Sequence, residues 1–313
     1  MTLALGLLTA VVIIGFLSPL YLRVAATPLL RPGLALTGWT SSVLLVALAL
    51  PVAGLLLAIP GDSGLDGLVG MADSCVNAIL VRDDVVWLDV ARLGTAAILL
   101  ALTARTITLA VVKVRRHRRH RGDHLTLLRS VARAEGPVLW LSEAAPMAYS
   151  VGGRHGAIVA TRGLRRLPAS EREAVLAHEK AHLRGRHHAL VLACDVIATA
   201  LPFIPLCRKA PGAVRVLVEL AADAAAARGH GATPVRSALL SVTAGQAPRT
   251  ALAMSRDAVD VRLLWLENHR PRLAKLPPRA DYAIAAALTA VPAIVSIATV
   301  AALVTLYCLT AVG

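Results

Sequence analysis

Aromatic residues, acidic residues and cysteines are all scarce in this sequence of 313 residues. Trp, Tyr and Phe together make up 3% of the chain, and 19 Asp and Glu residues stand against 33 Lys and Arg residues. The cysteines are Cys75, Cys194, Cys207 and Cys308. They show no C-x-x-C spacing, so they predict no disulfide framework. Because bases would find few aromatic side chains to stack on, the basic excess does not favour direct nucleic-acid binding.

Hydrophobic residues, in contrast, are abundant. They form 57% of the chain, and the mean hydropathy of +0.66 is typical of a membrane protein. Three stretches of about 20 or more residues, enough to cross a bilayer, carry no charge: residues 3–22, 33–61 and 282–313. Residues 86–112 predict a further span, although it contains Asp89, Arg92 and Arg105. A buried helix of a soluble domain is the alternative for this last stretch.

Positive charge is concentrated directly after residues 86–112. The formal net charge is +14, and six Lys and Arg residues lie within residues 113–121. The positive-inside rule places this basic segment in the cytoplasm, and the acidic residues 61–85 fit an external loop. The N-terminus and the C-terminus are then both outside a multi-pass cell-membrane protein. Anionic lipid is the expected partner of the basic segment, with a nucleic-acid patch as the alternative.

An H-E-x-x-H motif at residues 178–182 points to a zinc peptidase. On a helix, His178 and His182 lie one turn apart on the same face, so both imidazoles can bind one Zn²⁺ ion. Glu179 is then placed to act as general base. Ser170 and Glu173 are spaced as a capping box and predict where this helix begins.

The residues around the motif predict a small α+β domain. Residues 125–134 are expected to form a helix, and residues 138–141 a strand. Residues 147–151 and 156–161 are expected to form a hairpin, whose edge strand would pair with an extended substrate or serve only as a structural sheet. Residues 189–205 are apolar, but Asp195 and two prolines interrupt them, which favours a buried or membrane-grazing helix over another span.

The third zinc ligand has two candidates. Residues 178–188 also satisfy the metzincin pattern, in which the chain turns at Gly185 and His188 binds the metal. However, the residues after Gly185 continue a helical pattern. The alternative is Glu219 on a later predicted helix, with Asp223 one turn further on to orient a ligating imidazole.

Together with the four predicted spans, the segments 148–151 and 161–164, the H-E-x-x-H helix and Glu219-x-x-x-Asp223 resemble the BlaR/MecR family of membrane-embedded metallopeptidases. They are also similar to the CAAX prenyl protease type. The resemblance implies His178, His182 and Glu219 as zinc ligands, Glu179 as base and Asp223 as support. It also implies a repressor of the BlaI/MecI kind as substrate. Family members commonly have Asp where this chain has His187, and drug-sensing members continue into a penicillin-binding domain that is not expected here.

We therefore expect a mainly α-helical integral membrane protein with four transmembrane helices and a cytoplasmic, gluzincin-like α+β zinc peptidase domain. The expected regions are 1–112 with three spans, 113–281 with the peptidase domain, and 282–313 with the last span. The expected activity is cleavage of a cytosolic or membrane-adjacent protein in signal transduction. The alternatives are a non-proteolytic signal transducer with a structural metal site, a membrane quality-control protease, and a transporter. Glu179 argues against a structural site, which needs no base.

Overall fold

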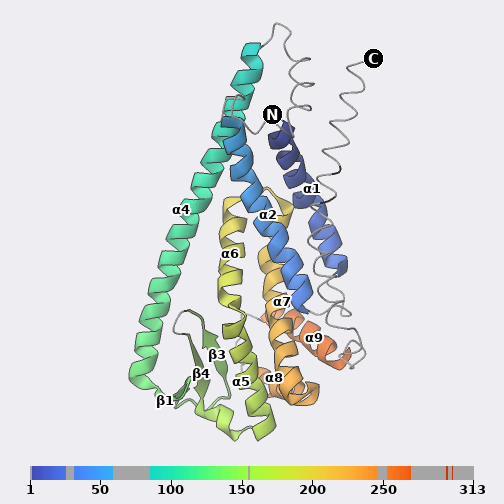
Figure 1. Cartoon of the computed structure of the whole chain (residues 1–313). Helices are drawn as coiled ribbons and strands as arrows, with labels where there is room; N and C mark the ends of the chain where they lie inside the picture. Colours follow the sequence, from blue (N-terminus) through green and yellow to red (C-terminus); the bar gives the residue numbers. More distant parts are fainter. Residues whose placement is uncertain are drawn as a thin grey trace.

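The computed structural model describes residues 2–25, 32–58, 85–153, 156–244 and 252–268, together with residues 294 and 298. The chain is mainly helical with one small mixed sheet (Figure 1). Two predicted elements lie almost wholly outside the described residues: the acidic loop 61–85 and the last span 282–313. Cys75 and Cys308 lie outside them as well.

Three long helices pass through the upper part of the molecule in Figure 1: α1 (Thr2–Ala25), α2 (Pro32–Ala58) and α4 (Val85–Val131). Helix α4 continues downward to the sheet. The shared core of the three helices includes Trp39, Val46 and Ala53, all 2% exposed or less. A Cβ atom added to Gly54 would lie 3.0 Å from Leu99 Cβ, so the small residue lets α2 and α4 approach closely.

Within the described residues, two helices rather than four are long and apolar enough to cross a membrane. They are Pro32–Ala58 and Asp89–Val131. In α1 the apolar helix Ala4–Leu20 falls short of that length. The helix that contains the predicted span 86–112 does not end at residue 112, because Lys and Arg are good helix formers and α4 continues through the basic segment. These two helices suggest a membrane protein.

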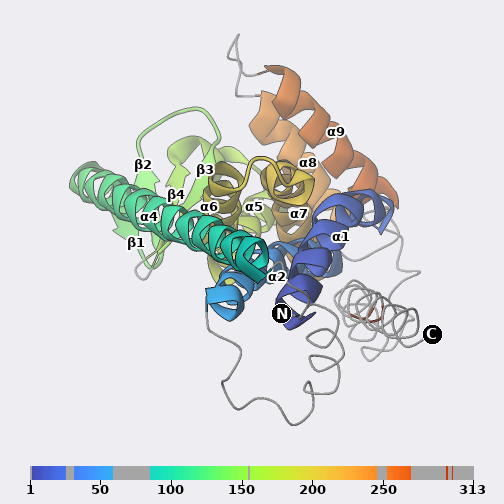
Figure 2. The same ribbon diagram turned by 90° about the horizontal axis from the view of Figure 1, so that it is seen from above.

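The apolar residues 189–205 form one arm of a helical hairpin. Helix α6 (His187–Ala200) ends before the turn, and α7 (Pro205–His230) returns with Pro205 at its first position. The hairpin packs against α1, α2 and α4, and Figure 2 shows it between α4 and α1. At its tip, Ile204 lies so close to Gly15 that a Cβ atom there would come within 2.8 Å. Segment 189–205 therefore enters the helix bundle and turns back.

The sheet contains strands β1 (Arg133–Glu135), β2 (Val138–Leu141), β3 (Ala148–Val151) and β4 (Ala157–Thr161). Their order is β1-β2-β4-β3, with β2 parallel to β4 and the other pairs antiparallel. The predicted hairpin is confirmed as β3 and β4. The helix predicted over 125–134 is wrong at its end, because α4 stops at Val131 and a turn with Gly136 at φ 57° brings β1 back onto β2.

Helix α5 (Ala169–Arg184) carries the motif and lies against the sheet and α7. The predicted capping box does not form: α5 begins at Ala169, Pro168 occupies the cap position, and no side chain caps the helix. Ser170 is thus already inside the first turn. A 3-10 helix (Arg162–Arg166) precedes α5, and α8 (Ala232–Ala244) and α9 (Leu252–Asn268) follow α7.

Candidate metal centre

The two motif histidines face each other across a short gap in the interior. Because they lie four residues apart on α5, His178 and His182 project from the same side of the helix. Their Nε2 atoms are 3.1 Å apart, and the two residues are only 9% and 7% exposed. Two basic nitrogens are therefore directed at one point in a nearly dry environment.

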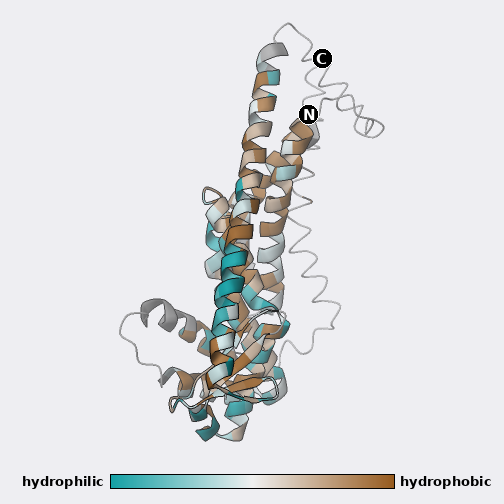
Figure 3. Cartoon of the chain, turned by 90° about the vertical axis from the view of Figure 1, so that its left-hand side faces the viewer, coloured by the Kyte–Doolittle hydropathy of each residue, from teal (hydrophilic) through white to brown (hydrophobic). Residues whose placement is uncertain are grey.

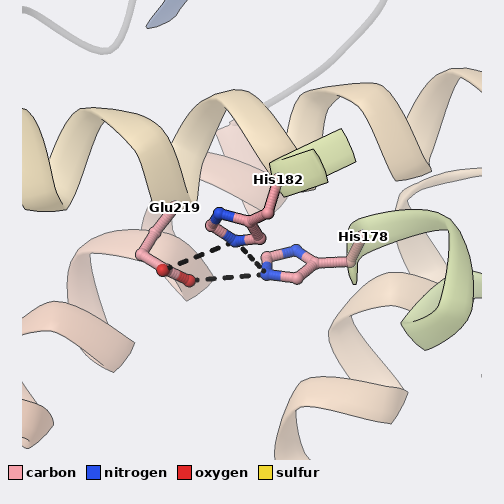
Figure 4. A group of neighbouring side chains, drawn as sticks. All are labelled: His178, His182 and Glu219. Carbon is pink, nitrogen blue, oxygen red and sulfur yellow. Dashed lines mark hydrogen bonds and ion pairs between the residues drawn. The ribbon is translucent and has the colours of Figure 1, made fainter. Parts of the chain in front are cut away.

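Glu219 on α7 completes a triangle of donor atoms with these histidines (Figure 4). Its carboxylate oxygens lie 3.4 Å from His178 Nε2 and 3.5 Å from His182 Nε2. Donor atoms at about 2.0–2.1 Å from a tetrahedral zinc would be about 3.3–3.4 Å apart. The 3.1 Å between the two Nε2 atoms, and the 3.4 and 3.5 Å from them to the two different carboxylate oxygens of Glu219, are close to that spacing. The carboxylate side chain of Glu219 is 35% exposed, so the site opens on one side.

Asp223 lies one helical turn after Glu219 and contacts the other nitrogen of His178. Its Oδ1 atom is 2.8 Å from His178 Nδ1, and its side chain is fully buried. That distance suits a hydrogen bond, yet His178 Nδ1 has no partner of good hydrogen-bond alignment. The electrostatic attraction between Asp223 and His178 depends on the 2.8 Å distance and not on the hydrogen-bond angle. Asp223 therefore favours a proton on Nδ1 and leaves Nε2 free to bind a metal.

Arg262 on α9 contacts the carboxylates of both Asp223 and Glu219. It donates two hydrogen bonds to Asp223, at 2.7 and 2.8 Å, and its guanidinium lies 3.2 Å from Glu219. Arg262 was not among the site residues predicted from the sequence. The feature that could have identified Arg262 is its place between Val261 and Leu263, on a helix whose Trp265 and Leu266 are buried. A charge in such a setting needs a buried partner.

These contacts separate the pKa values of the site residues. Burial lowers the pKa of His178, but the contacts with Asp223 and Glu219 outweigh it and raise the pKa to about 9. Burial lowers the pKa of His182 to about 3. Burial raises the pKa of Glu219, but His178 and Arg262 outweigh it and bring the pKa to about 2. At neutral pH Glu219 is therefore an anion and His182 a neutral base, as metal ligands require, whereas His178 has to release a proton from Nε2 when it binds a metal.

Glu179 borders this triangle without belonging to it. Burial raises the pKa of its carboxyl group, and the positive charge of His178 and a contact with Ser150 only partly offset this. A carboxylate with a raised pKa is a stronger proton acceptor near neutral pH. Ser150 belongs to β3, so Glu179 lies next to the edge strand of the sheet.

His187 contacts the second motif histidine from behind. The chain leaves α5 at Gly185, Arg186 adopts a left-handed conformation at φ 49°, and α6 begins at His187. A Cβ atom on Gly185 would collide with the His187 ring, so only glycine leaves room for it. This break corrects the expectation that the helical pattern continues through Gly185.

The break allows His187 Nδ1 to lie 3.0 Å from His182 Nδ1. When His182 Nε2 serves as a metal ligand, its proton resides on Nδ1, which then donates to His187. His187 thus supplies the acceptor at the position where the resembling family commonly has Asp. His188, the alternative third ligand, instead contacts Ser150 through Nε2 at 3.1 Å and is not among the three clustered donors.

The donor atoms and the residues that orient them are typical of a zinc-dependent hydrolase. The comparison with known families narrows this class to the zinc metallopeptidases. Residues 115–258 match the model of Peptidase family M48, and this match together with the site indicates a zinc metallopeptidase. Its cofactor is zinc, and the cluster of His178, His182 and Glu219 could hold one ion. No curated protein and no solved structure matches the chain.

Replacing His187 with Leu is expected to weaken zinc binding by about 10–100-fold, because the acceptor that orients His182 is lost. His187→Asp should retain most of the affinity, since a carboxylate accepts the same proton. Competition with a fluorescent zinc chelator measures both values, and His188→Leu is the matched control on the neighbouring residue. Equal affinities for His187→Leu and His188→Leu would show that His187 does not orient the ligand.

Proposed function

We propose that this chain is a membrane-embedded zinc endopeptidase that cleaves a cytosolic or membrane-adjacent protein, with His178, His182 and Glu219 as zinc ligands. The observation that carries the proposal is the cluster of His178, His182 and Glu219, in which one donor atom from each residue lies within 4.8 Å of the others. Glu179, which lies beside it and ligates nothing, is assigned as general base. Asp223 is assigned as the residue that orients His178.

The chemistry follows from this arrangement. When bound, zinc polarises a peptide carbonyl and lowers the pKa of a coordinated water to about 7. Glu179 takes the proton from the attacking water, and its raised pKa suits it to pass that proton on to the leaving amine. Arg262 keeps both Glu219 and Asp223 ionised throughout.

The edge strand β3 is proposed to hold the substrate. Among the described strands it pairs with β4 alone, and Ser150 on this strand contacts Glu179. An extended peptide that added to the free edge would therefore run past the base and the metal ligands. Main-chain hydrogen bonds would give binding with little dependence on sequence.

The membrane arrangement is part of the same proposal. We infer four spans, with residues 1–112 and 282–313 in the membrane region, both termini outside and a cytoplasmic peptidase domain at 113–281. The basic segment 113–121 supports this orientation and would contact anionic lipid. The regulatory proposal is that the substrate is a transcriptional repressor of the BlaI/MecI kind. The resemblance of the motif set to the BlaR/MecR family supports it.

Orientation can be tested by cysteine labelling. In a variant with Cys75 and Cys308 replaced by Ser, Cys194 and Cys207 are buried. A cysteine introduced at Arg166 of this variant should resist a membrane-impermeant maleimide in intact cells and react after permeabilisation. Arg166 is exposed in the structure, so lack of reaction would not come from burial. Labelling from outside in intact cells would overturn the cytoplasmic placement.

Repressor cleavage can be tested in cells that co-express the chain with candidate repressors encoded beside its gene. The expected result is a shortened repressor and expression of the genes that it controls, with the parent protein only. Glu179→Gln should leave the repressor whole and the genes silent. Equal signalling by both would make the protein a transducer that acts by contact.

A further inference from the structure

A groove of about 660 Å³ lies between α4, α6 and α7, away from the metal centre. Three basic side chains line it, Lys113 and Arg116 from α4 and Arg215 from α7. His117 and His120 add further nitrogen atoms, and Asp195 on α6 is the one acidic residue in its lining. With neutral histidines the groove carries three cations and one carboxylate, an excess of two positive charges.

The groove is preorganised by contacts with the helical hairpin. Arg215 donates two hydrogen bonds to Asp195, at 2.7 and 2.8 Å, which accounts for the acidic charge. Lys113 reaches across from α4 to the Thr199 hydroxyl at 2.6 Å. Arg116 donates to His120 through Nε at 3.3 Å, so most of its five N–H groups are directed elsewhere. These contacts fix the positions of the three basic side chains and leave N–H groups of Arg116 available to an anion.

In the proposed membrane placement, the groove lies at the level of the lipid headgroups, because it begins where the apolar part of α4 ends. Lys113 follows the last residue of the apolar part of α4. Figure 3 shows that the long helix changes from mainly hydrophobic to hydrophilic along its length. One turn above Arg116, Val112 is 55% exposed and offers an apolar surface to an acyl chain. Higher still, Arg105 donates to the carbonyl of Thr199, near the tip of α6. An occupant would meet Lys113 and Arg116 below and the apolar surface at Val112 above, while Arg105 is engaged by the Thr199 carbonyl.

We propose that this groove binds the phosphate headgroup of an anionic phospholipid, whose acyl chains lie along α4. Basic recesses between membrane helices on the cytoplasmic side recognise such headgroups. The proposal rests on the membrane placement proposed above and adds a specific site to it. If the basic segment attracted lipid only by its total charge, all its Lys and Arg residues would contribute equally. The groove, however, is lined by Lys113 and Arg116 and not by Arg115 or Arg118.

The test is a titration of the purified full-length protein with phosphatidylglycerol, followed by native mass spectrometry. One saturable lipid is expected per chain, with weaker binding of phosphatidylcholine. Lys113→Gln combined with Arg116→Gln should weaken phosphatidylglycerol binding by about 10–100-fold, since charged hydrogen bonds are lost. Arg115→Gln combined with Arg118→Gln removes the same charge from the same turns and should change binding by less than about threefold.

Equal losses in the two double variants would overturn the site in favour of diffuse attraction. Competition by millimolar inorganic phosphate would show that free phosphate, and not lipid, is the ligand. Unchanged thermal unfolding and zinc content control for folding, and the single variants Arg116→Gln and Arg118→Gln repeat the comparison if a double variant is unstable. Lipid binding needs no proteolysis, so this outcome is independent of the Glu179 experiments.

Discussion

Replacing Glu179 with Gln is expected to slow peptide hydrolysis by about 10²–10⁴-fold while zinc stays bound. The loss corresponds to about 3–5 kcal/mol of barrier, the usual contribution of a general base. Gln has nearly the same shape as Glu but takes no proton from water. Because the clustered donor atoms come from His178, His182 and Glu219, the metal site should be unaffected.

The measurement is the cleavage rate of a denatured, fluorescently labelled protein, with zinc content determined on the same samples. Lys180→Gln is the matched control, because Lys180 is the exposed neighbour on the same helix. That control should cleave at the parent rate. A Glu179→Gln rate within about threefold of the parent would remove Glu179 from the mechanism.

Removing any one zinc ligand, in contrast, should weaken zinc binding itself. Zinc binding at four-ligand protein sites is worth about 10–16 kcal/mol, roughly 3–4 kcal/mol per ligand if shared equally. His178→Ala, His182→Ala and Glu219→Ala should therefore each lower zinc affinity by about 10²–10³-fold. All three should also lose peptidase activity.

His188→Ala is the control that separates the two possible ligand sets. His188 contacts Ser150 and lies outside the donor triangle, so zinc affinity should stay within about threefold of the parent. Plasma emission spectrometry after dialysis against a chelator gives the zinc content of all four variants. Loss of zinc in His188→Ala with retention in Glu219→Ala would assign the site to the metzincin arrangement.

The features predicted correctly from the sequence depend on local spacing. His178 and His182 come together because any α-helix places residues four apart on one face. The strands β3 and β4 are recognisable because two short strand-like segments flank a Gly-rich turn. The approach of Glu219 from a distant helix needs more than spacing, and its prediction depends on the paired acidic residues and the family resemblance.

The features missed from the sequence depend on tertiary contacts. Ser170 and Glu173 have the right spacing for a capping box, yet Pro168 takes the cap position and α5 starts two residues early. Strand β1 is three exposed residues with no strand-like alternation, and it exists because β2 is beside it. No sequence pattern shows that α6 turns back at Ala200 inside a bundle formed by segments far away in the chain.

Arg262 illustrates the same limit at the metal centre. Its role depends on α9 lying against α7, which places a guanidinium between Asp223 and Glu219. His187 is the opposite case. Its position in the sequence stands out as a departure from the family pattern, but its contact with His182 depends on the left-handed turn at Arg186.

The central claim is zinc-dependent proteolysis that requires Glu179, and the most direct test works with an unidentified substrate. Parent protein and Glu179→Gln, each loaded with zinc and reconstituted in vesicles, are incubated with cytosolic proteins, and new N-termini are identified by mass spectrometry. The account predicts a set of new N-termini that appears with the parent protein and is absent with Glu179→Gln or after removal of zinc by a chelator. The same N-termini in all three samples would contradict it.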